Sequence, residues 1–208
     1  MYYFDEDPDE EIEEPQEEQE EKAPRELGYE TIKKLLETRT ILLFGEINMK
    51  VAERISQQLL LLASDSDDDI KLIINSPGGH VESGDTIFDM IRFVKPKVKI
   101  IGTGWVASAG ALIFVAADKE NRYSLPNTRF LLHQPMGGTG IRQASDIAIE
   151  AEEIIKMRRR LNETFAEQTG QPIERVEKDT ERNFWLSAVQ AKEYGLVSKV
   201  ITSMGEVE

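Results

Sequence analysis

Apolar and polar residues alternate along the chain in blocks that predict strands separated by helices. Short apolar runs predict buried strands over residues 40–45, 70–75, 97–104, 127–134 and 196–201. Stretches with helical spacing predict helices over 29–39, 49–66, 80–95, 106–118, 144–168, 172–182 and 186–195. Strands that alternate with crossover helices are typical of an α/β fold with a largely parallel sheet.

The helix predicted over 144–168 is long for a chain of 208 residues. Its apolar stripe is interrupted by many charged residues and comprises Ile147, Ile149, Ile154, Ile155, Leu161 and Phe165. Two interpretations are open: a helix that projects and packs against another subunit, or an ordinary surface helix.

Charge is concentrated near the N-terminus. Residues 5–21 (DEDPDEEIEEPQEEQEE) hold twelve acidic residues and no Lys or Arg, and without them the net charge of −14 falls to −2. Such a segment cannot bury enough apolar surface to fold, so residues 1–26 are predicted to be a disordered tail, and 27–208 one domain. Two roles are open for this tail: it solubilises the protein, or it is an arm that docks a partner or regulates the protein. Its negative charge argues against binding of nucleic acid.

Further exclusions come from composition. The chain has no cysteine, and it shows neither a secretory signal nor an apolar run of about 18 residues. We therefore expect a cytoplasmic protein without membrane contact. A metal site is not expected, since the acidic run 65–69 is typical of a solvated loop. No cofactor is expected either, and without a Walker A motif the chain itself should not hydrolyse ATP.

Ser108 stands in the apolar stretch GTGWVASAGALIF, between a predicted strand and a predicted helix. A serine there is a favoured helix N-cap. It is also placed to be a nucleophile, since a helix N-terminus favours developing negative charge. Serine needs an adjacent base for that chemistry. His133 ends a predicted strand, at the edge where α/β sheets place their sites, and His80 is the rival base.

The turn NSPGG (75–79) ends another predicted strand. Paired glycines allow a close backbone approach, so a backbone N–H of this turn could complete an oxyanion hole with the amide that follows Ser108. A simple tight turn is the other interpretation.

Four segments, INSPGG, GWVASAG, LPNTRFLLHQPMGG and DTERNFWLSAVQAKEYGLV, together resemble the proteolytic subunit of the ATP-dependent Clp protease, ClpP, over residues 27–201. The resemblance implies the ββα spiral fold that ClpP shares with crotonases, with 144–168 as a projecting handle helix. It implies a serine endopeptidase of two stacked heptameric rings, a tetradecamer. Such rings cleave unfolded polypeptides that a Clp-type AAA+ unfoldase (ClpX, ClpA or ClpC) delivers.

The resemblance also assigns roles to residues. Ser108 matches the nucleophile, His133 the general base, and the amides of Gly79 and Ala109 the oxyanion hole. The segments that flank the peptide cleft match Gly78, His80, Met136, Gly137 and Gly138. A substrate held there as an extended strand would be bound through its backbone, with little sequence preference.

Three features depart from the family pattern. The third triad position, usually aspartate, is Asn183, whose amide can orient an imidazole but carries no full negative charge. Asp179, one helical turn earlier, could assist. Lys71 and Ile73 stand where tyrosines usually line a docking pocket for the unfoldase, and the N-terminus is a polyanion. These departures predict a weakened Ser-His-Asn peptidase that depends on assembly, with a second ClpP paralogue as a candidate partner.

Two further hypotheses remain. A silent or regulatory ring subunit that binds an active paralogue is favoured by Asn183 and the acidic tail, whereas the intact Ser108 and His133 oppose it. An acyl-CoA enzyme of the crotonase type would share the fold, since fold alone does not fix chemistry. Such enzymes commonly use a glutamate acid/base and lack this Ser-His pair.

Overall fold

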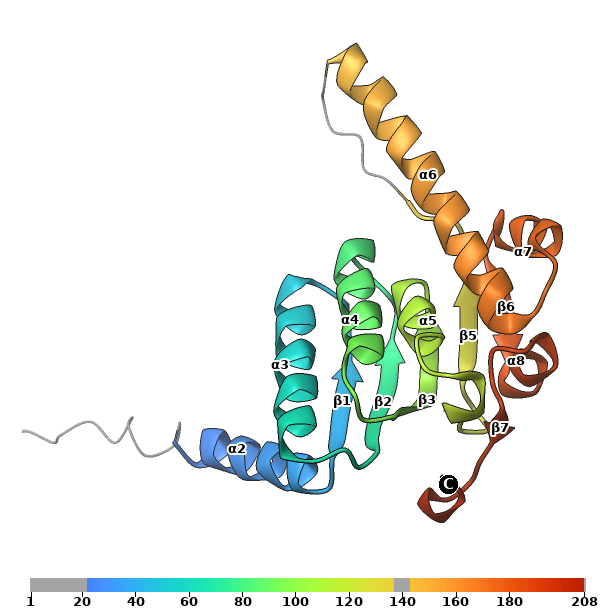
Figure 1. Cartoon of the computed structure of the whole chain (residues 1–208). Helices are drawn as coiled ribbons and strands as arrows, with labels where there is room; N and C mark the ends of the chain where they lie inside the picture. The colour runs from blue at the N-terminus through green and yellow to red at the C-terminus, as the bar shows by residue number, and fades with distance from the viewer. Residues whose placement is uncertain (1–21, 137–142, 208) are drawn as a thin grey trace, which may run out of the picture.

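The computed structural model describes residues 22–136 and 143–207. Within these ranges strands and helices alternate along most of the chain, and the helices lie mainly against one side of a central sheet (Figure 1). No helix in these ranges combines the length and the apolar character that a bilayer crossing requires.

The sheet has seven strands, and parallel pairing joins β1 (Thr40–Phe44), β2 (Ile70–Ser76), β3 (Val98–Ala107), β4 (Arg122–Ser124) and β7 (Lys199–Val200) in that order. β3 is shared between two branches. Its first half pairs with β4, and its second half pairs with β5 (Arg129–Leu132). β6 (Phe184–Ser187) then adds to β5 in the antiparallel sense. The chain therefore forms the predicted α/β fold with a largely parallel sheet.

Three helices cover one face of this sheet: α3 (Met49–Asp65), α4 (Val81–Phe93) and α5 (Ala109–Phe114) (Figure 1). Their apolar faces and those of β1–β3 form the main core, in which residues such as Ile55, Leu72 and Phe114 have no exposed surface. Burial of such side chains stabilises a fold by about 1.5–3 kcal/mol each. A smaller cluster on the other face contains Ile101, Tyr123 and Ile201.

The other predicted helices are α6 (Ala144–Thr169), α7 (Ile173–Thr180), α8 (Ala188–Tyr194) and α2 (Lys22–Glu37). α2 begins earlier than the pattern predicted, so residues 22–26, which we expected in the tail, belong to this helix. Residues 1–21 lie outside the described part of the chain. Two short 3₁₀ turns, Lys119–Asn121 and Met204–Glu206, complete the elements.

Larger differences from the sequence prediction occur at the junction of β3 with α5 and in two short strands. β3 continues to Ala107, so the helix predicted over 106–118 is shortened to α5. The pattern missed β4 and β6, which have three and four residues. Strands this short carry too few alternations to be distinguished from loops. Of the two strands, β6 is the more important for the candidate site, because it brings the segment that contains Asn183 to the end of β5.

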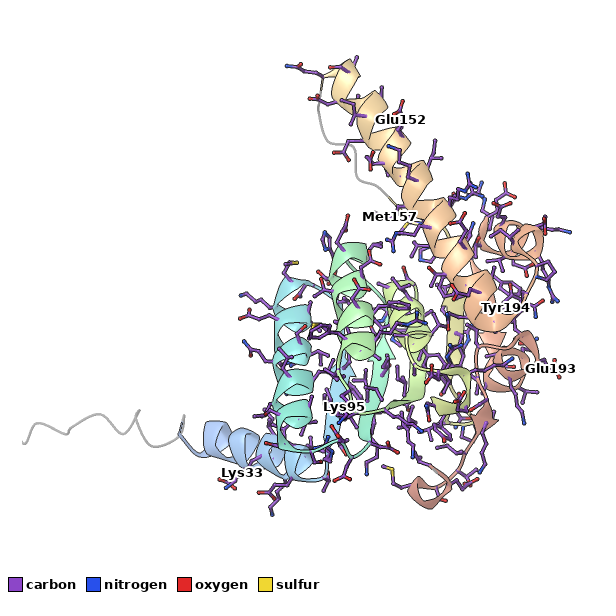
Figure 2. The ribbon with its side chains drawn as sticks, viewed as in Figure 1. Lys33, Lys95, Glu152, Met157, Glu193 and Tyr194 are labelled. Atoms are coloured by element: carbon purple, nitrogen blue, oxygen red, sulfur yellow. The ribbon has the colours of Figure 1, made fainter. Side chains whose placement is uncertain are left out.

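α6 is a helix of 26 residues that extends beyond the rest of the molecule (Figure 1). Near its C-terminal end Leu161 and Phe165 are buried in the core, whereas Ile149 and Ile155 are about two-thirds exposed. Figure 2 shows Glu152 on the projecting part and Met157 nearer the body, where Met157 packs against the core. The helix therefore projects as expected, and its packing against another subunit stays a prediction.

Candidate active site

Ser108 occupies a sharp turn between the end of β3 and the start of α5. Its backbone has φ 55° and ψ −122°, a conformation that a non-glycine residue rarely adopts. Such strain costs about 1–3 kcal/mol and persists only where the surroundings impose it. The Ser108 amide donates to the Leu131 carbonyl at 2.9 Å, which ties the turn to β5. Strained turns of this kind are concentrated at functional sites.

The structure bears on one of the two sequence interpretations of Ser108, the helix cap. Although this residue stands at the N-cap position of α5, its side chain makes no capping hydrogen bond. The Ser108 carbonyl, rather than the hydroxyl, accepts bonds from the amides of Ala111 and Leu112. The half-buried hydroxyl is therefore not engaged as a cap.

His133 directly follows β5, beside the strand end from which Ser108 leaves β3. Ala107 pairs with Leu131 in parallel register, so the two strands end at the same edge of the sheet. Ser108 and His133 line one narrow cavity of about 20 Å³. Burial lowers the pKa of the His133 imidazole below its usual 6.5. Its neutral form, the one that can accept a proton, is thus favoured near pH 7.

The remaining walls of this cavity are apolar. They comprise Val81, Ala109, Leu112, Leu132, Pro135, Leu161 and Phe165. Leu161 and Phe165 come from α6, one helical turn apart, and sequence reasoning did not assign them to the site. Their spacing on an apolar stripe was visible in the sequence, but nothing in the pattern showed that α6 crosses over Ser108.

Asn183 lies in the connection between α7 and β6. Leu132 pairs with Phe184 at the end of the antiparallel β5–β6 ladder, so His133 and Asn183 each stand one residue beyond this last pair. Both residues line a second, open cleft of about 370 Å³. His133 is thus common to the cavity with Ser108 and to the cleft with Asn183.

Gln134 fastens the His133 segment to the Asn183 segment. Its amide donates to the Thr180 carbonyl at 2.8 Å, and its side-chain Nε2 donates to the Glu181 carbonyl at 2.9 Å. Thr180 in turn donates from Oγ1 to the buried Asn162 of α6 at 2.9 Å. Within the described residues, however, no hydrogen bond joins His133 to the Ser108 hydroxyl or to Asn183. The three residues thus lie near one another, but their side chains are not connected by hydrogen bonds, as is common in ligand-free sites.

The glycine turn at 78–79 packs directly on the Ser108 turn. A Cβ on Gly78 would lie 2.6 Å from Ser108 Cβ and 3.1 Å from the Ala109 nitrogen, so only glycine fits there. The Ser76 hydroxyl accepts from the Gly78 amide at 3.0 Å and braces the turn. This close approach brings the turn beside the amide of Ala109.

The orientation of the Gly79 amide follows from its pairing with Ile47. In this parallel bridge the Ile47 amide donates to the Gly78 carbonyl, and the His80 amide donates to the Ile47 carbonyl. The N–H of Gly79 itself is therefore directed to the opposite side of the segment. Ala109 follows Ser108 directly, and Gly79 follows Gly78, which contacts both Ser108 and Ala109, so the two expected oxyanion donors lie in segments that contact each other.

The two alternative partners named from sequence are engaged elsewhere. His80 Nδ1 lies 2.9 Å from Ser83 Oγ, and its Nε2 lies 3.3 Å from a carboxylate oxygen of Glu82. The Asp179 carboxylate accepts from the Tyr194 hydroxyl at 3.1 Å and pairs with Arg175 at 3.6 Å. His133 is therefore better placed than His80 to serve Ser108, and Asp179 is occupied by other groups.

The residues expected to flank a bound peptide are only partly described. Gly78 and His80 lie in the turn beside Ser108, and Met136 is 85% exposed at the rim of the cleft that contains His133. Gly137 and Gly138 lie outside the described residues. Within residues 22–136 and 143–207, no group of three His, Asp or Glu side chains could hold a metal ion.

Comparison with known proteins defines the class to which this fold and site belong. The chain matches the Clp protease family over residues 23–204, and it belongs to that family. Its sheet and helices therefore form the ClpP fold, as the motifs predicted.

Two relatives are similar in sequence to this chain over most of their length. The ATP-dependent Clp protease proteolytic subunit 3 of Rhizobium meliloti is 60% identical over 189 residues, which cover 91% of this chain and 96% of the relative. Subunit 2 of Pseudomonas aeruginosa is 56% identical over 181 residues, covering 87% and 90%.

Solved structures agree with the sequence relatives. ClpP1 from Listeria monocytogenes is 55% identical with a TM-score of 0.77, and a mutant of it with aspartate in place of an asparagine is 56% identical with a TM-score of 0.80. In both comparisons 86% of this chain and 99% of the Listeria chain are covered.

Proposed function

We propose that this chain is a serine endopeptidase subunit of a Clp-type compartmental protease, with Ser108, His133 and Asn183 as its catalytic triad. The observation that carries the proposal is the strained Ser108 turn, with an uncapped hydroxyl in the same cavity as His133. Strain, an unengaged hydroxyl and an adjacent imidazole together are what an activated serine requires.

The chemistry follows from the protonation state of His133. The neutral imidazole accepts the proton from Ser108 as Oγ attacks a peptide carbonyl, and later gives that proton to the leaving amine. The amides of Gly79 and Ala109 stabilise the oxyanion that forms. Hydrolysis of the acyl-serine by water, through the same base and donors, releases the second product and regenerates the enzyme.

Asn183 orients the histidine without giving it a counter-charge. Its side-chain oxygen accepts from His133 Nδ1–H and so fixes the tautomer whose Nε2 faces the serine. Because an amide carries no net charge, it stabilises the imidazolium less than a carboxylate would. The proposed enzyme is therefore active but weak on its own.

The architecture of the site favours unfolded polypeptide as the substrate. An extended chain bound along Gly78, His80 and Met136 would place one side chain at the cavity beside Ser108, whose volume of about 20 Å³ fits a small apolar group. We propose assembly into two stacked heptameric rings through α6, whose exposed isoleucines offer an apolar surface. A second ClpP paralogue is the proposed partner that completes an active particle.

Docking of a Clp-type unfoldase is proposed to be weak for a particle of this chain alone. Lys71 and Ile73 are half-buried neighbours on β2, paired with Thr40 and Leu42 of β1. A lysine in an apolar docking surface must be desolvated or displaced. Robust ATP-dependent degradation by the pure protein with ClpX would contradict this part of the proposal.

The proposed function is tested by peptidase turnover of the assembled particle, alone and mixed with an active paralogue. We expect slow cleavage of short fluorogenic peptides by the particle alone and none by the Ser108→Ala variant. Full activity of that variant would overturn the assignment of the nucleophile.

A silent regulatory ring subunit is the second candidate. It is favoured by the lack of hydrogen bonds from His133 to the Ser108 hydroxyl and to Asn183 among the described residues. In that case the chain would change the particle's mass and the activity of the paralogue without cleaving peptides. Ser108→Ala would then leave the turnover of the mixed particle unchanged, whereas the first proposal predicts a decrease.

A further inference from the structure

A fork-shaped ion pair connects α4 to α6 beside the proposed active site. Arg160 Nη1 and Nη2 lie 2.8 and 2.7 Å from the two carboxylate oxygens of Asp85. The Asp85 side chain is 25% exposed and that of Arg160 is 50% exposed. Two parallel N–H···O bonds fix both the distance between the helices and their relative rotation, which a single bond would not.

Both partners stand next to residues that form the cavity beside Ser108. Val81 begins α4 and lines the cavity, and Asp85 follows one helical turn later on the same face. Leu161 lines the cavity from α6 and is adjacent in sequence to Arg160. The ion pair therefore joins the two helices whose side chains form opposing walls.

α4 also carries the turn that holds the proposed oxyanion donor. The helix begins at Val81, two residues after Gly79, and Gly84 packs its Cα against Ala109, with a Cβ there placed 3.1 Å from Ala109 Cβ. A shift of α4 relative to α6 would consequently move a wall of the cavity.

Other charges around Arg160 reinforce its attraction to α4. The hydrogen bond to Asp85 raises the pKa of Arg160, and the charges of Asp85, of Asp89 one turn beyond it and of Glu82 one turn before it raise this pKa further. The pair is partly exposed to solvent, so its contribution to overall stability is small. Its effect is expected in the geometry of the cavity rather than in folding.

We propose that Asp85 and Arg160 form a positioning pair that sets the width of the cavity beside Ser108, and hence the size of the side chain accepted at the cleaved bond. This inference rests on the proposed function, because it takes that cavity as the place where a substrate side chain binds. The pair touches neither substrate nor the reacting atoms, and acts through Val81 and Leu161.

The test compares Asp85→Asn and Arg160→Gln with the parent protein in the assembled particle. Two readouts are used: kcat/KM for fluorogenic peptides, and the rate of Ser108 labelling by peptidyl phosphonates. Each is measured with alanine and with phenylalanine at the reacting position. Loss of the fork widens the cavity, so the phenylalanine-to-alanine ratio should rise about fivefold or more in each variant.

Matched variants separate this effect from a general loss of charge. Arg160→Lys keeps the charge but cannot form the fork, and it should raise the ratio as well. Arg159→Gln removes a neighbouring arginine that pairs with Glu163 on the exposed side of α6, and it should leave the ratio unchanged. The double variant Asp85→Asn/Arg160→Gln should change the ratio no more than either single variant, because both remove one interaction.

The outcomes distinguish this inference from the proposed function. If labelling and turnover depend on Ser108 but the ratio is the same in every Asp85 and Arg160 variant, the positioning pair is wrong and the peptidase stands. If the ratio changes equally in Arg159→Gln, the effect is one of charge alone and the inference is again overturned. Activity that survives Ser108→Ala would refute the proposed function itself.

Discussion

His133 and Asn183 each stand one residue past the last pair of the antiparallel β5–β6 ladder, Leu132 with Phe184, and both line one cleft. The same histidine lines the cavity that contains Ser108. A single strand end thus connects the proposed nucleophile on one side with the proposed third member of the triad on the other. The effects expected of substitutions at Asn183, and the expected pH profile, depend on this relationship.

Replacing Asn183 with aspartate should accelerate peptide cleavage. A carboxylate opposite His133 would stabilise the imidazolium that forms as the serine attacks, whereas the amide provides orientation alone. We expect kcat to rise roughly tenfold or more, within the about four orders of magnitude that the reverse change costs in a serine protease. Steady-state peptidase rates of the assembled particle measure this change.

Asn183→Ala is the control for that substitution. It removes both charge and orientation, so its rate should fall below that of the parent. An unchanged rate in Asn183→Asp would show that the third position does not limit catalysis.

The pH dependence of kcat/KM should report the titration of His133. Burial lowers the pKa of this imidazole, and only the neutral form accepts the proton from Ser108. Activity should therefore be retained below the ordinary histidine value of about 6.5 and be lost as the pH falls through the lowered pKa. In Asn183→Asp the added negative charge should move this acid limb to higher pH. An acid limb that lies above 6.5 in the parent would contradict the role of burial.

Gly78→Ala should impair the site through a steric clash. The residue has φ 97°, and an added Cβ would lie 2.6 Å from Ser108 Cβ and 2.7 Å from the Ala107 carbonyl. Because backbone and Cβ atoms cannot rotate away, the 78–79 turn must shift away from Ser108. We expect at least a roughly tenfold loss of peptidase activity and a destabilisation of about 1–3 kcal/mol.

Gly205→Ala provides the comparison for Gly78→Ala, since nothing lies within 4 Å of a Cβ at that position. Its activity and unfolding midpoint should match those of the parent. Comparable losses in the two variants would mean that crowding at Ser108 is not the cause.

Arg122→Met should destabilise the fold. The buried guanidinium donates to the carbonyls of Ala117 at 2.7 Å and Val115 at 3.2 Å, and to the carbonyl and Oε1 of Gln168 at 2.8 and 2.6 Å. Burial, together with the nearby Arg92, lowers its pKa to about 10, which leaves it charged at pH 7. Methionine would leave these acceptors unsatisfied, at a cost of about 3 kcal/mol.

Chemical denaturation of Arg122→Met and of Arg159→Met would measure this effect. Arg159 is exposed and pairs with Glu163, so its loss should change the unfolding midpoint little. Equal shifts of the unfolding midpoint in the two variants would show that the hydrogen bonds of Arg122 add no stability beyond that of an exposed arginine.

Much of the fold could be predicted from the sequence because its elements are strongly periodic. The strand at 70–75 and the helix at 49–66 have unambiguous patterns, and the structure has β2 and α3 at these places. β6 was missed because FWLS is too short to show a period. Its pairing with β5 depends on residues more than fifty positions apart in the chain, which local patterns do not encode.

The candidate site could be proposed from the sequence as a set of residues, but the arrangement of those residues could not be predicted. Ser108 and His133 were identified by their chemistry and by the family motifs, and the structure places them in one cavity. The walls from α6 and the Asp85–Arg160 pair were not identified, because a salt bridge between residues 75 positions apart depends on how helices cross. The strain at Ser108 was also hidden, since its positive φ arises from the junction of β3 and α5.

Covalent labelling with a fluorophosphonate, located by peptide mass mapping, tests most directly whether His133 activates the Ser108 hydroxyl. The account predicts one adduct, on Ser108, in the assembled protein. Neither Ser108→Ala nor His133→Ala should form it, and Asn183→Asp should form it faster. Labelling of Ser108 at the same rate in His133→Ala, or no labelling of Ser108 in any assembled form, would contradict it.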